Sequence, residues 1–124
     1  MDHFEAVLIP ADPDRDIEVV LYRKPEQLLD VLYEMIGCDC VDKTPRLTTQ
    51  SGDEFRVWVD DVGLRPAEGE IEHNDRAIAL CRSVGYEIPD VGGNAVVTGG
   101  DDVEGWTETV PPRLRDQILA VLKF

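Results

Sequence analysis

Alternating apolar and polar residues in the middle of the chain constrain its fold more than any other feature. Residues 55–60 read Phe-Arg-Val-Trp-Val-Asp, so the odd-numbered positions are apolar. Successive side chains of a β-strand point to opposite faces, and this period of two is therefore typical of a half-buried strand. A second strand is predicted over Gly92–Gly99, where Ala95, Val96 and Val97 lie between paired glycines. These two strands are the best-specified part of the predicted core.

The first third of the chain predicts a hairpin followed by a helix. Strands are expected at Glu5–Ile9 and Ile17–Tyr22, and the short polar turn between them favours antiparallel pairing. Apolar residues repeat at helical spacing over Pro25–Ile36, with acidic residues on the opposite side. Pro25 suits the first helical position because its missing N–H would have no partner there, and Gly37 suits a left-handed cap.

The rest of the chain predicts two more helices and two short strands. Asn74 is a favoured N-cap for a helix over Asp75–Val84, because its side-chain oxygen can accept a hydrogen bond from an unpaired backbone N–H. Short strands are predicted at Cys38–Val41 and Arg46–Thr49. A last helix, residues 111–124, starts at a Pro-Pro pair, and its apolar stripe can pack on the sheet or pair with a second copy.

Together these elements predict an α+β fold. We expect a mostly antiparallel sheet of about five strands, with one main helix packed on a face, a short helix and a C-terminal helix. A chain of 124 residues has the usual size of one domain. We therefore expect residues 1–124 to form a single domain without disulfide or metal cross-links, and three cysteines in such a chain are typical of reduced thiols.

The formal net charge of −14 limits the classes of partner. A field of this sign repels nucleic-acid phosphates and acidic membranes, so we expect no direct binding to nucleic acid or membrane. It leaves open a basic protein partner, mimicry of the phosphate array of DNA, or a merely solubilising surface. The sequence has no stretch of ~20 apolar residues and no signal-peptide pattern at its start, so we expect a cytoplasmic protein.

Two metal-like patterns lack the full ligand set that their metal requires. Residues 12–16 have the Asp-x-Asp-x-Asp spacing that opens an EF-hand loop, but the Gly and Glu required later in that loop are replaced by Ile17 and Arg23. Structural zinc prefers wider spacing than Cys38-x-Cys40 and needs four ligands, while Cys81 fits the apolar side of its own helix. We expect no metal and no cofactor.

Side chains suited to nucleophilic catalysis are scarce. The serines are Ser51 and Ser83, the histidines are His3 and His73, and none lies in a recognisable nucleophile or triad pattern. Adjacent carboxylates carry little information in a chain with 26 acidic residues. No catalytic residue is assigned.

Several short segments together carry a resemblance to a known family. They are Val57–Gly63 (Val-Trp-Val-Asp-Asp-Val-Gly), Asn74-x-Arg76-Ala77 and Gly93–Gly99 (Gly-Asn-Ala-Val-Val-Thr-Gly). With the two N-terminal strands and the first helix, they resemble the DUF3846 family over about Val7–Asp102, leaving residues 111–124 outside. Members of that family are small domains of unknown function, encoded mainly by phages, plasmids and other mobile elements. The resemblance implies a mobile-element accessory protein and transfers no catalytic residue.

The first functional hypothesis is a non-catalytic accessory protein that binds a host protein. It would act as a monomer or homodimer, in the host cytoplasm if the chain is phage-encoded. Its candidate contacts are Trp58 and Trp106, expected to be exposed, with the neighbouring Asp60 and Asp61. Aromatic residues often dominate protein interfaces, which is why the tryptophans are chosen.

The second hypothesis is a protein that binds or sequesters a small nucleotide-type ligand. Its candidate residues are two glycine turns around Asn94, namely Gly92 with Gly93 and Gly99 with Gly100, whose backbone N–H groups could contact a phosphate. The same glycines suit simple turns at strand ends, because glycine tolerates unusual backbone angles. The third hypothesis is an acidic DNA mimic.

Overall fold

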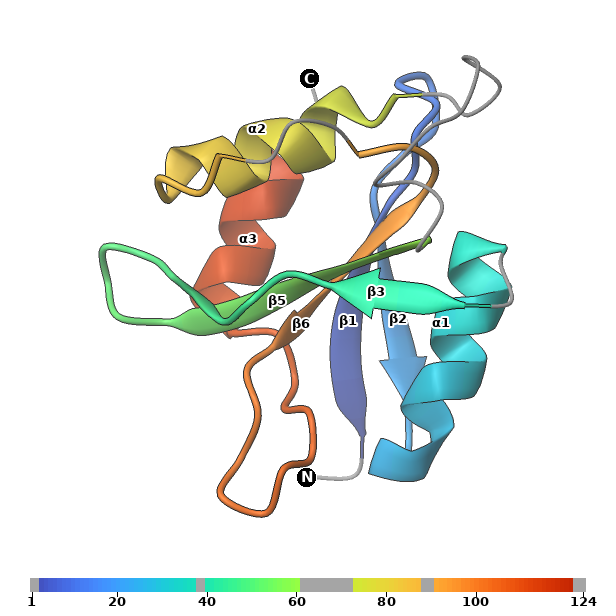
Figure 1. Ribbon diagram of the computed structural model, residues 1–124, viewed down its shortest axis with the longest axis vertical. Helices are drawn as coiled ribbons and strands as arrows, with labels where there is room; N and C mark the ends of the chain where they lie inside the picture. The colour runs from blue at the N-terminus through green and yellow to red at the C-terminus, as the bar shows by residue number, and fades with distance from the viewer. Residues whose placement is uncertain (1–2, 38–39, 61–72, 88–90, 122–124) are drawn as a thin grey trace.

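The computed structural model describes residues 3–37, 40–60, 73–87 and 91–121. In these residues six strands form one antiparallel sheet with the order β2-β1-β6-β5-β3, and β4 also pairs with β5 (Figure 1). The strands are β1 (Phe4–Ile9), β2 (Glu18–Tyr22), β3 (Val41–Lys43), β4 (Leu47–Thr48), β5 (Glu54–Asp60) and β6 (Ala95–Gly99). The helices are α1 (Leu28–Ile36), preceded by the 3-10 turn η1 (Pro25–Gln27), α2 (Asp75–Ser83) and α3 (Pro112–Val121).

The predicted α+β fold with a mostly antiparallel sheet is confirmed. The N-terminal hairpin pairs Phe4 with Tyr22 and Leu8 with Glu18, as a short turn between consecutive strands favours. Gly37 ends α1 with a φ of 77°, a left-handed conformation that glycine adopts without steric cost. None of the helices in the described part of the chain is long and apolar enough to cross a membrane.

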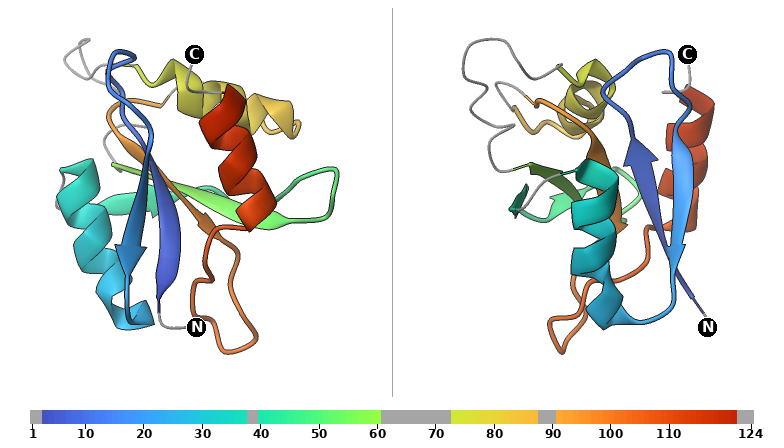
Figure 2. Two further views of the ribbon diagram at one scale, coloured as in Figure 1. Left: turned by 180° about the vertical axis from the view of Figure 1, so that it is seen from behind. Right: turned by 90° about the vertical axis from the view of Figure 1, so that its right-hand side faces the viewer.

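Helices cover both faces of the sheet, which gives three layers (Figure 2). On one face α1 buries Leu28, Leu32 and Ile36. This spacing of four residues places the three side chains in one row on the helix. On the other face α2 and α3 pack against a separate cluster of apolar side chains that includes Phe55 and Val57.

The predicted alternation of β5 is confirmed, with Trp58 as the one buried residue on the face expected to meet solvent. Phe55, Val57 and Val59 lie on the face covered by α2 and α3, and Trp58 lies on the face covered by α1. Trp58 is only 7% exposed. The alternation in the sequence correctly separated the two faces, but a tryptophan on the supposed solvent side serves here as a second core residue because α1 covers it.

The C-terminal helix belongs to the core, a question that its apolar stripe left open. Leu114 and Ile118 are buried against the sheet cluster, and Val110 is buried just before the helix. The Arg115 guanidinium donates a hydrogen bond to the Glu5 carboxylate on β1, so an ion pair also joins α3 to the sheet.

Asn74 joins three parts of the fold and is completely buried. Its Oδ1 accepts from the backbone N–H of Ala77 at 3.1 Å, which confirms the predicted N-cap of α2. Its Nδ2 donates to the carbonyl of Ile9 at 2.9 Å and to that of Gly93 at 3.0 Å. One amide therefore fixes the start of α2 to the end of β1 and to the turn before β6.

We predict that Asn74→Ala lowers the free energy of unfolding by about 2–4 kcal/mol, because it removes a helix cap and the side-chain donor to the carbonyls of Ile9 and Gly93. Urea unfolding followed by circular dichroism measures the change. Asn74→Asp is the matched variant, since it keeps the cap acceptor but has no Nδ2 donor. An Asp variant as stable as the wild type would mean that the bonds to Ile9 and Gly93 contribute nothing.

Burial of Cys81 makes the stability of the fold depend on pH. Cys81 is 0% exposed on α2, and burial raises the pKa of its thiol from 9.0 to about 11. The unfolded chain loses this proton near pH 9 while the folded chain keeps it, so stability is complete below pH 9 and falls as the pH rises toward 11. Burial likewise raises the pKa of Tyr22 from 10.0 to about 12, which adds a decline above pH 10.

We therefore predict that Cys81→Ala removes most of the loss of stability between pH 9 and pH 10 and leaves the Tyr22-dependent loss, which grows around and above pH 10. The measurement is the urea midpoint of both proteins across this range. Equal slopes for wild type and variant would contradict the assignment to the thiol.

Candidate functional site

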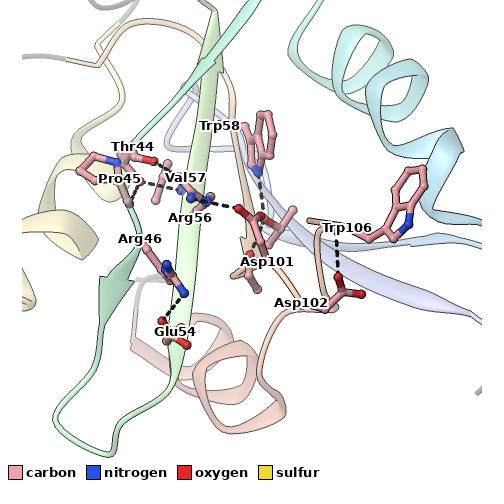
Figure 3. A network of polar contacts seen from close by, with 12 residues as sticks. Thr44, Pro45, Arg46, Glu54, Arg56, Val57, Trp58, Asp101, Asp102 and Trp106 are labelled. Atoms are coloured by element: carbon pink, nitrogen blue, oxygen red, sulfur yellow. Dashed lines mark hydrogen bonds and ion pairs between the residues drawn. The ribbon is translucent and has the colours of Figure 1, made fainter. Parts of the chain in front are cut away.

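A network of polar contacts occupies the end of the sheet where β5 and β6 meet the β3–β4 connection (Figure 3). Its centre is Arg56, whose Nη1 donates to the carbonyl of Thr44 at 2.9 Å and whose Nη2 donates to Asp101 Oδ2 at 3.1 Å. Thr44 is buried, and its hydroxyl oxygen accepts from the backbone N–H of Val57. The network connects β5 to the segment that follows β6.

Trp58 uses both its polar and its aromatic parts inside the fold. Its Nε1 donates to the hydroxyl of Thr98 at 2.8 Å, and the Lys43 ammonium lies 5.0 Å from the ring centroid. The expectation that Trp58 is exposed as a contact residue is therefore wrong. The indole N–H would be costly to bury without a partner, and Thr98 on the neighbouring strand supplies one.

Of the two acidic candidate residues beside Trp58, the structure describes Asp60. Asp60 is the last residue of β5, pairs with Val41 on β3 and is half-buried. Asp61 lies outside the described residues. The candidate surface formed by Trp58, Asp60 and Asp61 is thus reduced, because its aromatic member is buried.

Trp106 lies on a closed turn that we call the acidic-aromatic turn, residues 101–108. Trp106 is 44% exposed and Val103 is fully exposed. Asp102 closes the turn: its Oδ1 accepts from the N–H groups of Glu104 and Trp106, and its own N–H donates to the Trp106 carbonyl at 2.8 Å. Figure 3 shows the Trp106 ring directed away from the Arg56–Asp101 ion pair.

Sequence reasoning treated this turn as irregular, although one signal was available. Asp102 and Gly105 stand three residues apart, the spacing of the first and last residues of a common β-turn. The structure joins them by a hydrogen bond from the Gly105 N–H to the Asp102 carbonyl, and Gly105 has a φ of 90°. The contact between Arg56 and Asp101 had no such local signal because 45 residues separate them.

The two glycine turns do not form one ligand pocket. Gly93 precedes β6 and Gly99 ends it, so a strand rise of ~3.3 Å per residue separates them by roughly 20 Å. Asn94 is engaged within the fold: its Nδ2 donates to the carbonyl of Met35, and its Oδ1 accepts from the N–H of Ala11. Gly92 forms a β-bridge with His73.

Gly99 and Gly100 also pair with the returning chain rather than exposing their backbone groups. The Gly99 N–H donates to the Glu108 carbonyl, and the Gly100 carbonyl accepts from the Glu108 N–H at 2.7 Å. A Cβ on Gly99 would collide with the carbonyl oxygen of Thr109. This close approach of two backbones is the reason for glycine at position 99.

A groove of about 470 Å³ lies elsewhere, between α2, α3 and the turn that joins β4 to β5. Leu80, Leu114 and Ile118 form its apolar part, and Ser51 and Gln117 contribute polar atoms. None of the described residues that line it carries a charge. The groove therefore lacks the cationic groups that would attract a nucleotide phosphate.

The metal-like patterns are accounted for by local structure. The Asp12 carboxylate accepts from the Asp14 N–H, and the Arg76 guanidinium donates to the backbone carbonyls of Pro10, Asp12 and Arg15. The positively charged Arg76 side chain thus already contacts the backbone carbonyls of this loop. The described residues contain no group of three His, Cys, Asp or Glu side chains suited to a metal.

The cysteine and serine candidates are also dispersed. Cys40 is exposed, Cys81 is buried on α2, and Cys38 lies outside the described residues. The Ser83 hydroxyl donates to the Leu80 carbonyl at 2.6 Å, a contact within its own helix. These positions provide no nucleophile–base pair among the residues described.

Comparison with known proteins gives a likeness of fold. No family model matches the chain, and no curated protein matches its sequence. A solved structure titled "Crystal structure of small RNA methyltransferase HEN1" is similar, with a TM-score of 0.65 and 19% identity over 94% of this chain. The chain spans 16% of the length of that protein's chain. At this identity the similarity concerns the fold alone.

We predict that Gly99→Ala lowers the free energy of unfolding by about 1–3 kcal/mol or more, because its Cβ meets backbone that cannot move aside. Gly100→Ala is the matched control. Its Cβ would lie 3.3 Å from Glu54 Cβ and 3.4 Å from Arg46 Cδ, a tight approach that needs a shift of only a few tenths of an ångström and does not overlap backbone atoms. Thermal unfolding compares the two, and equal losses would contradict the steric role of Gly99.

Proposed function

We propose that this chain is a non-catalytic interaction protein that binds a basic protein partner through the acidic-aromatic turn. The observation that carries the proposal is the exposure of Trp106 and Val103 at the tip of a turn closed by hydrogen bonds. Single exposed apolar side chains are common on protein surfaces, but two of them on one short turn favour a contact surface.

The charge of the turn defines the kind of partner. Residues 101–108 contain four acidic side chains and no basic one. Asp101 is neutralised by Arg56, while Asp102, Glu104 and Glu108 are exposed. An interface that buries Trp106 and is rimmed by these carboxylates is complementary to an apolar pocket surrounded by lysine or arginine side chains.

Hydrogen bonds and an ion pair hold the acidic-aromatic turn in place without a bound partner. Asp102 accepts two backbone hydrogen bonds within the turn, and the ion pair of Asp101 with Arg56 attaches its base to β5. A contact residue that is already held in place loses less conformational entropy on binding. This rigidity supports Trp106 as the anchor in preference to Trp58, which is part of the core.

The resemblance to the DUF3846 family adds a biological setting to the proposal. A mobile-element accessory protein that acts by binding a host protein needs a recognition surface and no catalytic group. Its partner would then be a bacterial host protein, met in the host cytoplasm.

We predict that Trp106→Ala weakens binding to the partner by roughly 30-fold or more, the usual effect of truncating an aromatic hot spot. The wild-type and variant chains are immobilised and exposed to the same bacterial lysate, and retained proteins are quantified by mass spectrometry. The partner is the protein whose retention requires Trp106 and falls with added salt. Calorimetry with the purified pair then gives the two dissociation constants.

Trp58→Phe serves as the control, since it removes an indole from the core and leaves the turn unchanged. Circular dichroism checks that both variants fold. If wild type and Trp106→Ala retain the same proteins in the same amounts, the acidic-aromatic turn is not the binding surface.

A further inference from the structure

The groove between α2, α3 and the turn that joins β4 to β5 has the size of a small-molecule site. The two helices and the turn can be followed in Figure 1. Its volume of about 470 Å³ lies within the range of roughly 300–1,000 Å³ that is usual for pockets that bind small molecules. Such pockets are lined mostly by apolar side chains with a few polar groups, which is also the composition of this groove.

The apolar part of the groove is fixed by the core of the protein. Leu80 on α2 and Leu114 and Ile118 on α3 line the groove, and each of them is at most 6% exposed. All three belong to the cluster of apolar side chains that packs on the sheet with Phe55 and Val57. A ligand would therefore meet a surface that is already formed, which lowers the entropic cost of binding.

The turn at the edge of the groove is also held by hydrogen bonds. The Thr49 N–H donates to the Asp53 carbonyl at 2.9 Å, and the Gly52 N–H donates to the Thr49 carbonyl at 3.0 Å. The Thr49 hydroxyl oxygen in turn accepts from the Asp53 N–H at 3.1 Å. This closed turn places Gln50 and Ser51 beside the groove.

The groove offers polar side chains that the fold does not use. Gln50, Ser51 and Gln117 make no side-chain hydrogen bond within the part of the chain that the structure describes. An amide side chain provides both donors and acceptors, and a hydroxyl provides one donor and two lone pairs. These groups can therefore pair with a carbonyl, a hydroxyl or an amide of a ligand.

The lack of charge selects the class of ligand. None of the described residues that line the groove is charged, although the chain has 26 acidic and 12 basic residues. An anion would be repelled by the net charge of −14 and would find no cationic partner in the groove. A cation would find no carboxylate there. Burying an unpaired charge is costly, so the groove favours a neutral molecule.

We infer that this groove binds an uncharged, mostly apolar small molecule that carries one or two hydrogen-bonding groups. The apolar part of the ligand packs on Leu80, Leu114 and Ile118, and its polar group pairs with Ser51 or Gln117. The groove shares no residue with the acidic-aromatic turn, so this inference does not depend on the proposed binding of a basic protein.

Two fluorescent probes that differ by one charge test the class of ligand. N-phenylnaphthylamine is neutral, and anilinonaphthalene sulfonate has the same rings with an added sulfonate. Each dye is titrated with the full-length protein. We expect the fluorescence of the neutral dye to saturate with a dissociation constant of roughly 1–100 µM, as suits a probe of this size. The sulfonate should bind more weakly, because the groove offers it no cation.

A pair of alanine variants tests the place of binding. Ala79 is an exposed residue of α2 that lines the groove, and Ala120 is an exposed residue of α3 that does not. Ala79→Phe fills the groove and should abolish saturable binding of the neutral dye. Ala120→Phe adds the same side chain elsewhere and should leave binding unchanged. Circular dichroism and thermal unfolding check that both variants fold.

A charge introduced into the groove gives a second test that does not depend on Ala79. Gln117→Lys should strengthen binding of the sulfonate dye by roughly threefold or more, because the ammonium pairs with the sulfonate. Ala120→Lys changes the net charge of the chain equally and should have less effect. Three outcomes overturn the inference: no saturable binding of the neutral dye, unchanged binding by a folded Ala79→Phe chain, or equal gains in the two lysine variants.

Discussion

Burial of both faces of β6 is the constraint on which the rest of the structure depends. All five residues of this strand are buried, with Val97 facing α2 and α3 and Val96 facing α1. A strand without a solvent face requires a helical layer on each side, because its apolar side chains would otherwise meet water. The neighbours β1 and β5 share this requirement, so that three helices distant in sequence are needed to complete one sheet.

This double layer explains why several residues that suggested a site serve the fold. Trp58 lies under α1 and gives its N–H to Thr98 on β6, and the Asn94 amide connects the carbonyl of Met35 at the end of α1 to the N–H of Ala11 after β1. Polar groups buried between the sheet and a helix need hydrogen-bond partners within the protein, because burying an unpaired polar group costs free energy. Among the described residues, the surfaces left for contact with other molecules include the acidic-aromatic turn at one end of the sheet and the apolar groove between α2 and α3.

Much of the fold could be predicted from local patterns, and the candidate site could be predicted only in part. The hairpin, the helix over Pro25–Ile36 and the Asn74 cap depend on residues close together in the sequence, and the structure bears them out. The exposure of Trp58 could not be predicted, because a period of two separates the faces of a strand without saying what covers them. The rigidity of the turn around Trp106 depends partly on Arg56, which is far away in sequence.

The amino-acid sequence by itself determined the class of fold, the acidic character and the position of most strands and helices, because periodicity, capping and turn preferences act over a few residues. Only the tertiary structure decided that α3 belongs to the core, that Gly99 packs against the backbone of Thr109, and that Trp106 rather than Trp58 faces outward. These outcomes depend on which distant segments come to lie on each face of the sheet. Whether a side chain is buried, and which residues it contacts, depends on the packing of the whole fold and cannot be read from a local sequence pattern.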